Sequence, residues 1–273
     1  LRADTLCGRG PGFRSWLKNS TNDDQWLWPM CGFESGKFVY IYTAALRKTK
    51  STGPFAFESA GHDFWAKVRL PGLEKIEYLP LPSFRGIGFG NGFVRRGGRI
   101  YAFGSKQNGL GADVFVASFP TGSPEAAWKF WDGKTWVRGV WKAEPVARAV
   151  STSVQVCELK GTIVISTSAL SLGCDQGKDI FVLTSRSLTG PFSSPRKIYE
   201  IPDRREGHSP FFYFPILHSE FINSKKEVLL TYSINNYEPC VPSCSKGRAI
   251  PDDYRPRAVR VPLRMILKSK GQP

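Results

Sequence analysis

The sequence is poor in histidine and contains no long apolar run. No stretch approaches the roughly 18 apolar residues that a membrane-spanning helix requires, so no membrane span is predicted. The six cysteines lie too far apart for a zinc ribbon, and three histidines add few other soft ligands. The sequence therefore predicts no metal site.

Motifs for nucleotide chemistry and for serine hydrolysis are also missing. There is no G-x-S-x-G segment and no phosphate loop. Residues 86–92 are rich in glycine, but no helical pattern follows that would receive a phosphate group. These absences predict a protein that works without a cofactor.

Acidic residues are outnumbered: 23 Asp+Glu stand against 38 Lys+Arg, which gives a formal net charge of +15. A basic excess of this size predicts an anionic partner, for example an acidic polysaccharide. The alternative is a solvated basic surface without a dedicated partner. No nucleic-acid-binding motif accompanies the basic residues, so a nucleic-acid partner is not predicted.

Turn-forming and aromatic residues are abundant. The chain has 27 glycines and 20 prolines spread along its length, and aromatic residues make up 13%. No amphipathic helical pattern extends beyond about two turns. Many short strands joined by turns fit this composition, so we predict an all-β fold.

A repeat supports this prediction. An apolar strand, a short polar turn and a second apolar strand recur four times. The second strands begin at Phe38, Ile100, Ile163 and Val228, which are 62, 63 and 65 positions apart. A third apolar run follows in each unit, over residues 63–68, 113–117, 179–183 and 258–261.

A unit of this length with three or four antiparallel strands is typical of a propeller blade. We therefore predict a single domain over residues 1–273 that forms a five-bladed β-propeller, with about 60–65 residues per blade and an incomplete first blade. A four-bladed ring is the alternative. We expect the protein to be a monomer.

The cysteines predict the compartment. Cys240 and Cys244 enclose Val-Pro-Ser in a turn-rich segment, where they can form a local disulfide. Disulfides place a protein outside the cytosol, so we predict an extracellular, secreted protein. The full pairing stays open, because six cysteines allow fifteen connectivities.

The innermost strands of a propeller line a central channel, so functional side chains are expected just before each polar turn. The candidates at these positions are Asp4, Asp24, Trp26, Trp28, Asn91, His218 and Glu220. Two carboxylates that face one channel can cleave a glycosidic bond, one as the acid and the other as base or nucleophile. We predict Glu220 as the acid and Asp4 as the base or nucleophile.

The other candidates are predicted to bind substrate. Trp26 and Trp28 share one face of a strand, as a core stack or as platforms for sugar rings. His218 lies between apolar neighbours on the same face as Glu220, where an ionisable pair is costly unless it is satisfied or functional. Asn91 and Asp24 are either turn or loop residues or hydrogen-bonding groups of the site.

Three segments carry a family resemblance: Trp-Leu-Trp-Pro at residues 26–29 with the following Gly-Phe, Trp-Lys-Phe-Trp-Asp-Gly at 128–133, and Tyr-Arg-Pro-Arg-Ala-Val-Arg-Val at 254–261. The chain resembles a group of secreted five-bladed propellers of unknown function, which is similar to glycoside hydrolases that include endo-D-arabinanases. The resemblance implies a catalytic Asp within a Gly-Asp-Thr element, and Asp4 within Ala-Asp-Thr matches it except for the glycine.

The resemblance also implies a carboxylate within a Ser-Thr-Glu element, where this chain has Ser-Thr-Ser and ends on Ser153. Three functions follow as hypotheses. The first is a glycoside hydrolase acting on an extracellular polysaccharide, with arabinan as the implied type. The second is a non-catalytic propeller that binds a glycan, and the third is a polysaccharide lyase.

Overall fold

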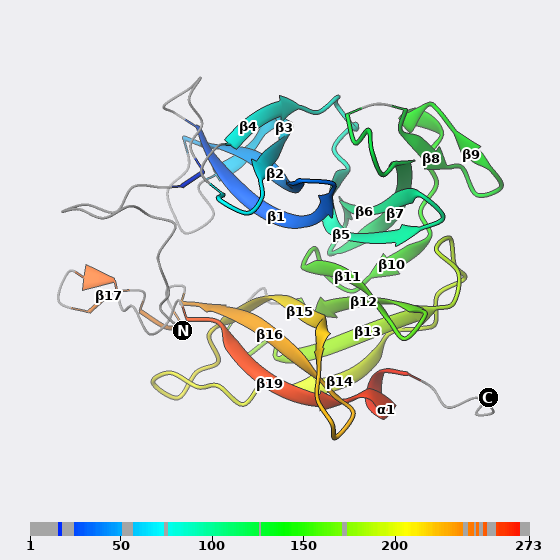
Figure 1. The fold of residues 1–273 in the computed structure, drawn as a ribbon. Helices are drawn as coiled ribbons and strands as arrows, with labels where there is room; N and C mark the ends of the chain where they lie inside the picture. Colours follow the sequence, from blue (N-terminus) through cyan, green and yellow to red (C-terminus); the bar gives the residue numbers. More distant parts are fainter. Residues whose placement is uncertain are drawn as a thin grey trace. The chain divides into compact units, whose positions relative to one another are not determined.

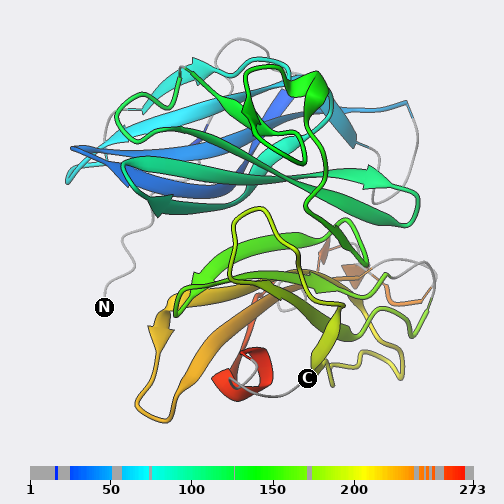
Figure 2. The same ribbon diagram turned by 90° about the vertical axis from the view of Figure 1, so that its right-hand side faces the viewer.

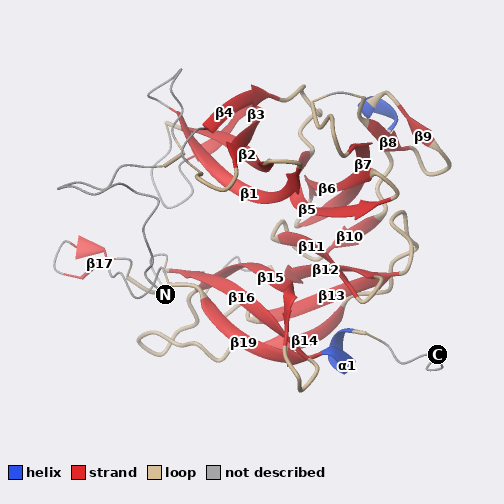
Figure 3. Ribbon diagram, in the orientation of Figure 1, coloured by secondary structure: helices blue, strands red, loops and turns tan. Residues whose placement is uncertain are grey.

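The computed structural model describes residues 16–17, 25–50, 57–73, 76–125, 127–170, 174–236, 240–242, 244–245, 248–249 and 255–267. Strands dominate this part of the chain (Figure 3). The helical elements are a 3-10 turn, Val140–Lys142, and the short helix α1, Leu263–Ile266. Neither has the length and apolar character that a membrane-crossing helix needs.

The chain divides into two compact units, residues 1–86 and 87–273. The first unit contains one antiparallel sheet with the strand order β1-β2-β3-β4. Its strands are β1 (Gln25–Ser35), β2 (Phe38–Lys48), β3 (Phe57–Arg69) and β4 (Ile76–Pro80). Leu27, Ala45 and Ala66 pack in an apolar cluster, while Trp65 is fully buried and meets Tyr42 edge to face.

The second unit contains three further sheets, which follow one another along the chain (Figure 1). The first of them is formed by β5 (Gly88–Arg96), β6 (Arg99–Asn108), β7 (Gly111–Pro120), β8 (Lys129–Trp131), β9 (Trp136–Val137) and β10 (Ala147–Ala149). The next consists of β11 (Val154–Leu159), β12 (Thr162–Ser168), β13 (Asp179–Ser185) and β14 (Arg196–Glu200).

The last of these sheets consists of β15 (Phe211–Ile222), β16 (Glu227–Asn235) and β19 (Arg257–Pro262). A separate two-stranded ribbon pairs β17 (Cys244–Ser245) with β18 (Arg248–Ala249). In Figure 2 the sheet β11–β14 lies against the sheet of β15, β16 and β19.

The blades of unit 2 stay together because their strands are apolar on both faces. In β12, Ile163 and Ile165 pack with residues of the preceding sheet, such as Val114. Val164, between them, packs on the opposite side with residues of the following sheet, such as Leu230. Successive side chains of a strand point to opposite faces, so a continuous apolar run suits a strand that is buried between two sheets.

The predicted hairpins are confirmed. In every sheet the first two strands pair antiparallel around the predicted polar turn, and the predicted third apolar run pairs with the second strand. In the turn between β11 and β12, Gly161 has a φ of +79°, a conformation that glycine adopts without steric cost.

The all-β propeller prediction is confirmed, but the count of five blades is wrong. The described residues form four blades, which was the alternative. The residues before the first repeat suggest part of a further blade, but the repeat pattern does not require one. The first repeat instead supplies all four strands of its own sheet, within residues 25–80.

Candidate functional site

The inner strands of unit 2 begin at one common end, which we call the strand-start end. β11 contacts both β5 and β15, so these three first strands are neighbours. Because Val154 pairs with Thr167 and Glu200 pairs with Asp179, the loop residues 169–170, 174–178 and 201–210 lie at the end where β11 begins. The second of these loops leads directly into β15.

Buried polar side chains gather at this end. Asn91 is 4% exposed, and its amide nitrogen donates to the carbonyl of Val154 over 2.7 Å. Its amide oxygen accepts from the Ser105 hydroxyl over 3.1 Å. The hydroxyls of Ser151, which precedes β11, and of Thr167 on β12 lie 3.3 Å apart. Buried polar groups of this kind either hold strands together or face a ligand.

Asn91 itself joins two blades. It lies on β5, and its hydrogen bond to Val154 reaches β11 of the next blade. The adjacent Gly92 allows the close approach, because a Cβ placed on it would lie 2.0 Å from the carbonyl oxygen of Val156. The predicted substrate-binding role of Asn91 stays a prediction, and the bonds above assign it a structural role in any case.

Ser153 also joins two blades. Its hydroxyl accepts a 2.6 Å hydrogen bond from the backbone N–H of Phe214 on β15. One position along, the carbonyl of Pro215 accepts a 2.5 Å bond from Ser166 on β12. The position at which the resemblance implies a carboxylate is thus occupied by a hydroxyl that anchors the backbone of the next inner strand.

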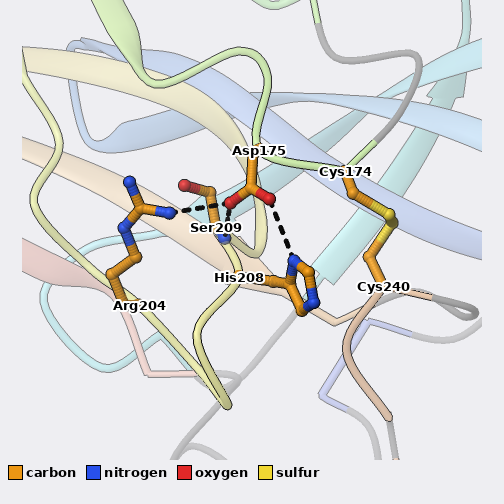
Figure 4. The surroundings of a disulfide bond; sticks show 6 residues. All are labelled: Cys174, Asp175, Arg204, His208, Ser209 and Cys240. Carbon is orange, nitrogen blue, oxygen red and sulfur yellow. Dashed lines mark hydrogen bonds and ion pairs between the residues drawn. A yellow bond between two sulfur atoms is a disulfide. The ribbon is translucent and has the colours of Figure 1, made fainter.

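An ionic cluster lies on the two loops at the strand-start end (Figure 4). The carboxylate of Asp175 accepts hydrogen bonds from Arg204 Nη1 over 2.8 Å and from the backbone N–H of Ser209 over 2.8 Å. Its other oxygen lies 2.9 Å from His208 Nδ1. The hydrogen bond from His208, followed by that from Ser209, holds the pKa of Asp175 below its usual range. Asp175 is therefore a carboxylate that organises both loops.

The loop that carries His208 has a second anchor. Asp203 accepts a 2.6 Å hydrogen bond from the Tyr232 hydroxyl and a 3.0 Å bond from Arg257 Nε. Burial, with a further contribution from Asp203, raises the pKa of Tyr232, so the hydroxyl keeps its proton and remains a donor. The loop is thus fixed to β16 and β19 as well as to Asp175.

A disulfide adjoins the ionic cluster. Cys174, directly before Asp175, is bonded to Cys240, which follows β16 (Figure 4). The predicted local bridge between Cys240 and Cys244 is therefore wrong. Sequence proximity favoured it, but the fold brings Cys174 to Cys240 across 66 residues with their Cα atoms 5.3 Å apart. The presence of a disulfide agrees with the predicted extracellular location.

His218 and Glu220 lie farther along β15. Phe211 pairs with Asn235 and Ile222 pairs with Val228, so Glu220 is close to the hairpin turn and away from the strand-start end. His218 Nε2 lies 2.8 Å from Thr231 Oγ1, and its Nδ1 lies 3.4 Å from a Glu220 oxygen. The Glu220 side chain is 61% exposed, so its carboxylate is largely in water.

The two predicted aromatic platforms belong to unit 1. Trp26 and Trp28 both contact the ring of Phe57, with centroid distances of 6.2 and 4.9 Å. Trp28 is 39% exposed, whereas Leu27 between them is buried. The two indoles thus lie opposite the apolar core, and their sugar-binding role stays a prediction. Asp4 and Asp24 lie outside the described residues.

Unit 1 also has a largely buried carboxyl group, which the sequence did not single out. The Tyr42 hydroxyl donates to Asp63. Burial raises the pKa of Asp63, although the hydrogen bonds from Tyr42 and the backbone of Ala45 act in the opposite direction. Burial of a charge without an ionic partner favours the neutral form of the group.

The sequence did not predict the Asp175 cluster. Arg204 belongs to no motif in the sequence, and Asp175 and His208 are 33 positions apart. The available signals were the cysteine directly before Asp175 and the rarity of histidine. Neither signal indicates which loops meet.

Comparisons with solved structures identify similar folds. The chain is similar to a suggested hydrolase from Bacteroides ovatus ATCC 8483, with a TM-score of 0.64, 18% identity, and coverage of 88% of this chain and 61% of that chain. It is also similar to the catalytic domain of a Coprinopsis cinerea GH62 α-L-arabinofuranosidase, with a TM-score of 0.45, 8% identity, and coverage of 90% and 94% respectively.

A third similar structure is the xylan β-1,4-xylosidase of Bacillus halodurans C-125, with a TM-score of 0.48, 12% identity, and coverage of 84% of this chain and 44% of that chain. The chain thus spans less than two thirds of the length of the Bacteroides ovatus protein. The search of curated proteins found no match. A family model described as Domain of unknown function (DUF5005) matches residues 6–263, so the chain belongs to the DUF5005 family.

Proposed function

We propose that this chain acts on an extracellular polysaccharide as a propeller of the glycoside hydrolase type, with the sugar bound at the strand-start end of unit 2. The observation that carries this proposal is that several polar groups lie at this same end. Asn91 and Ser153 lie at the inner strands, and Asp175 and His208 lie on the two loops at the same end. In ligand sites a small number of placed polar groups fixes the orientation of the ligand and gives specificity.

The charge of the chain extends the proposal to acidic polymers. A net charge of +15 raises the local concentration of an anionic polysaccharide and speeds its encounter with the protein. This attraction falls as salt is added, since mobile ions screen exposed charges. Binding should therefore weaken with ionic strength for a uronate-containing polymer and change little for neutral arabinan.

The mechanism predicted from the sequence pairs Asp4 as base or nucleophile with Glu220 as acid. Glu220 is exposed and lies toward the hairpin end of β15, so its role as acid requires the sugar to reach that end. Replacement of each carboxylate by its amide, Asp4→Asn and Glu220→Gln, tests the two roles separately. Glu125→Gln changes an exposed glutamate of a β7–β8 turn and serves as the matched control.

The second candidate is a propeller that binds a glycan without cleaving it. Ser153 favours this version, because it stands where the resemblance implies a carboxylate and its hydroxyl is bonded to Phe214. A lyase is the third version and requires a base beside a group that neutralises a uronate.

The test is a digestion screen of the purified chain against arabinan, arabinogalactan and uronate-containing polysaccharides. New reducing ends without near-ultraviolet absorbance support hydrolysis, and absorbance at new chain ends indicates a lyase. Salt-sensitive binding without products supports the non-catalytic version. Neither binding nor products on the folded protein would contradict the proposal.

A further inference from the structure

The Asp175–His208 pair has the arrangement of an acid–base dyad. A carboxylate beside one ring nitrogen of histidine fixes that nitrogen as the N–H side, which leaves the other nitrogen to exchange protons. Here Asp175 lies 2.9 Å from Nδ1 of His208, and Nε2 points away from Asp175 (Figure 4). The His208 side chain is 47% exposed, so Nε2 can reach a ligand.

Asp175 is well suited to position this histidine. It accepts hydrogen bonds from Arg204 and from the backbone of Ser209, and Ser209 is buried. These bonds hold the carboxylate in its charged form and lower its pKa. A fixed carboxylate keeps the imidazole in one orientation and stabilises the positive charge that forms when Nε2 takes up a proton.

The position in the fold connects the pair with the proposed site. His208 is three residues before β15, the inner strand of its blade, and the loop is anchored through Asp203 to Tyr232 and Arg257. The charged groups of the cluster come from two loop segments: Asp175 from residues 174–178, and Arg204 from residues 201–210.

We propose that His208, in place of Glu220, is the acid–base residue of this site and that Asp175 is its positioning residue, an inference that rests on the proposed hydrolysis of a polysaccharide. Nε2 of protonated His208 gives its proton to the glycosidic oxygen as the bond from that oxygen to the anomeric carbon breaks. The hydroxyl of a water molecule attaches to that carbon, and the second proton of the water returns to Nε2. One glycosidic bond and one water thus give two hydroxyl-ended products, and the ring ends as it began.

The test uses the full chain and the polysaccharide on which the wild type produces the most reducing ends. General acid–base groups contribute about 10²–10⁴-fold to rate, so His208→Gln should lower kcat by about that factor while the thermal midpoint stays close to that of the wild type. His62→Gln is the matched control, because His62 is an exposed histidine of unit 1 bonded to Gln25. Its turnover should equal that of the wild type.

The pH profile of activity distinguishes a positioning role of Asp175 from a purely structural role. A general acid must carry its proton, and Asp175 stabilises the protonated ring. Asp175→Asn should therefore lower kcat and move the alkaline limb of the profile to lower pH. A structural role alone would lower activity at every pH without moving the limb.

Each outcome has a separate meaning. The proposal is supported if the wild type cleaves a polymer, His208→Gln loses most of the kcat, and Asp175→Asn moves the alkaline limb of the pH profile. If the kcat of His208→Gln stays within about threefold of the wild-type value, the dyad is overturned and the proposed function remains. A wild type that binds a polymer without cleaving it overturns the dyad and leaves the non-catalytic version of the proposed function. A wild type that neither binds nor cleaves any of the polymers overturns both.

Discussion

Replacement of Gly92 by alanine should destabilise the contact between two blades of unit 2. Gly92 lies on β5 at the point where this strand approaches β11. A Cβ at this position would lie 2.0 Å from the carbonyl oxygen and 2.8 Å from the carbonyl carbon of Val156. Both contacts are to backbone atoms, so no side-chain rotation relieves them.

The magnitude follows from the geometry. Overpacking of a buried site usually costs about 1–3 kcal/mol, and a clash with backbone on a neighbouring blade belongs at or above the upper end. Alanine in a strand recovers about 0.5–1 kcal/mol of backbone entropy relative to glycine. We therefore expect a net loss of about 2–3 kcal/mol in the free energy of unfolding.

Urea unfolding measures this loss. With a slope of about 3 kcal/mol per molar urea, the midpoint should fall by roughly 0.7–1 M. Gly88→Ala is the matched control, because Gly88 lies on the same strand, its φ is not positive, and no atom lies within 4 Å of the position that a Cβ would take there. Equal midpoints for the two variants would refute the reasoning, since both add one methyl group to β5.

Three further predictions concern buried polar groups. Asn91→Ala leaves the Val154 carbonyl without its donor and should cost about 1–3 kcal/mol in urea unfolding. Ser153→Ala leaves the N–H of Phe214 without its acceptor and should also cost about 1–3 kcal/mol. Thr152 is the exposed neighbour of Ser153, and its replacement by alanine should be tolerated. Burial raises the pKa of Asp63 in the folded protein, so the stability linked to this group is fully present below pH 3.8 and is lost as the pH rises through the folded value. Asp63→Asn should therefore gain in stability relative to the wild type as the pH rises above 3.8, and a difference that stays constant with pH would contradict the assignment.

The strands and hairpins could be predicted from the sequence because they depend on local information. Apolar runs separated by polar turns define each hairpin, and the repeat places the same pattern four times. The number of blades is different, because it depends on how sheets pack and not on the pattern within each one. The residues before Gln25 suggested an extra blade, whereas the first sheet takes its strands from residues 25–80.

The site was harder to predict because its residues meet only in the folded chain. Asn91 follows from its position on an inner strand, and the structure brings it to the beginning of β11. The same rule treated all of β15 as one site and so included Glu220, although strand direction places it toward the hairpin. Asp175 and His208 lie on loops, for which no strand periodicity exists, and their encounter depends on the packing of two blades.

The most direct test of the central claim is a residue-resolved map of sugar binding, by NMR or by a crystal structure with a bound oligosaccharide from the best polymer of the screen. The account predicts that the sugar contacts the strand-start end of unit 2, with changes at Asn91, Ser153 and His208. Binding confined to Trp26 and Trp28, or to Glu220 at the hairpin end of β15, would contradict it.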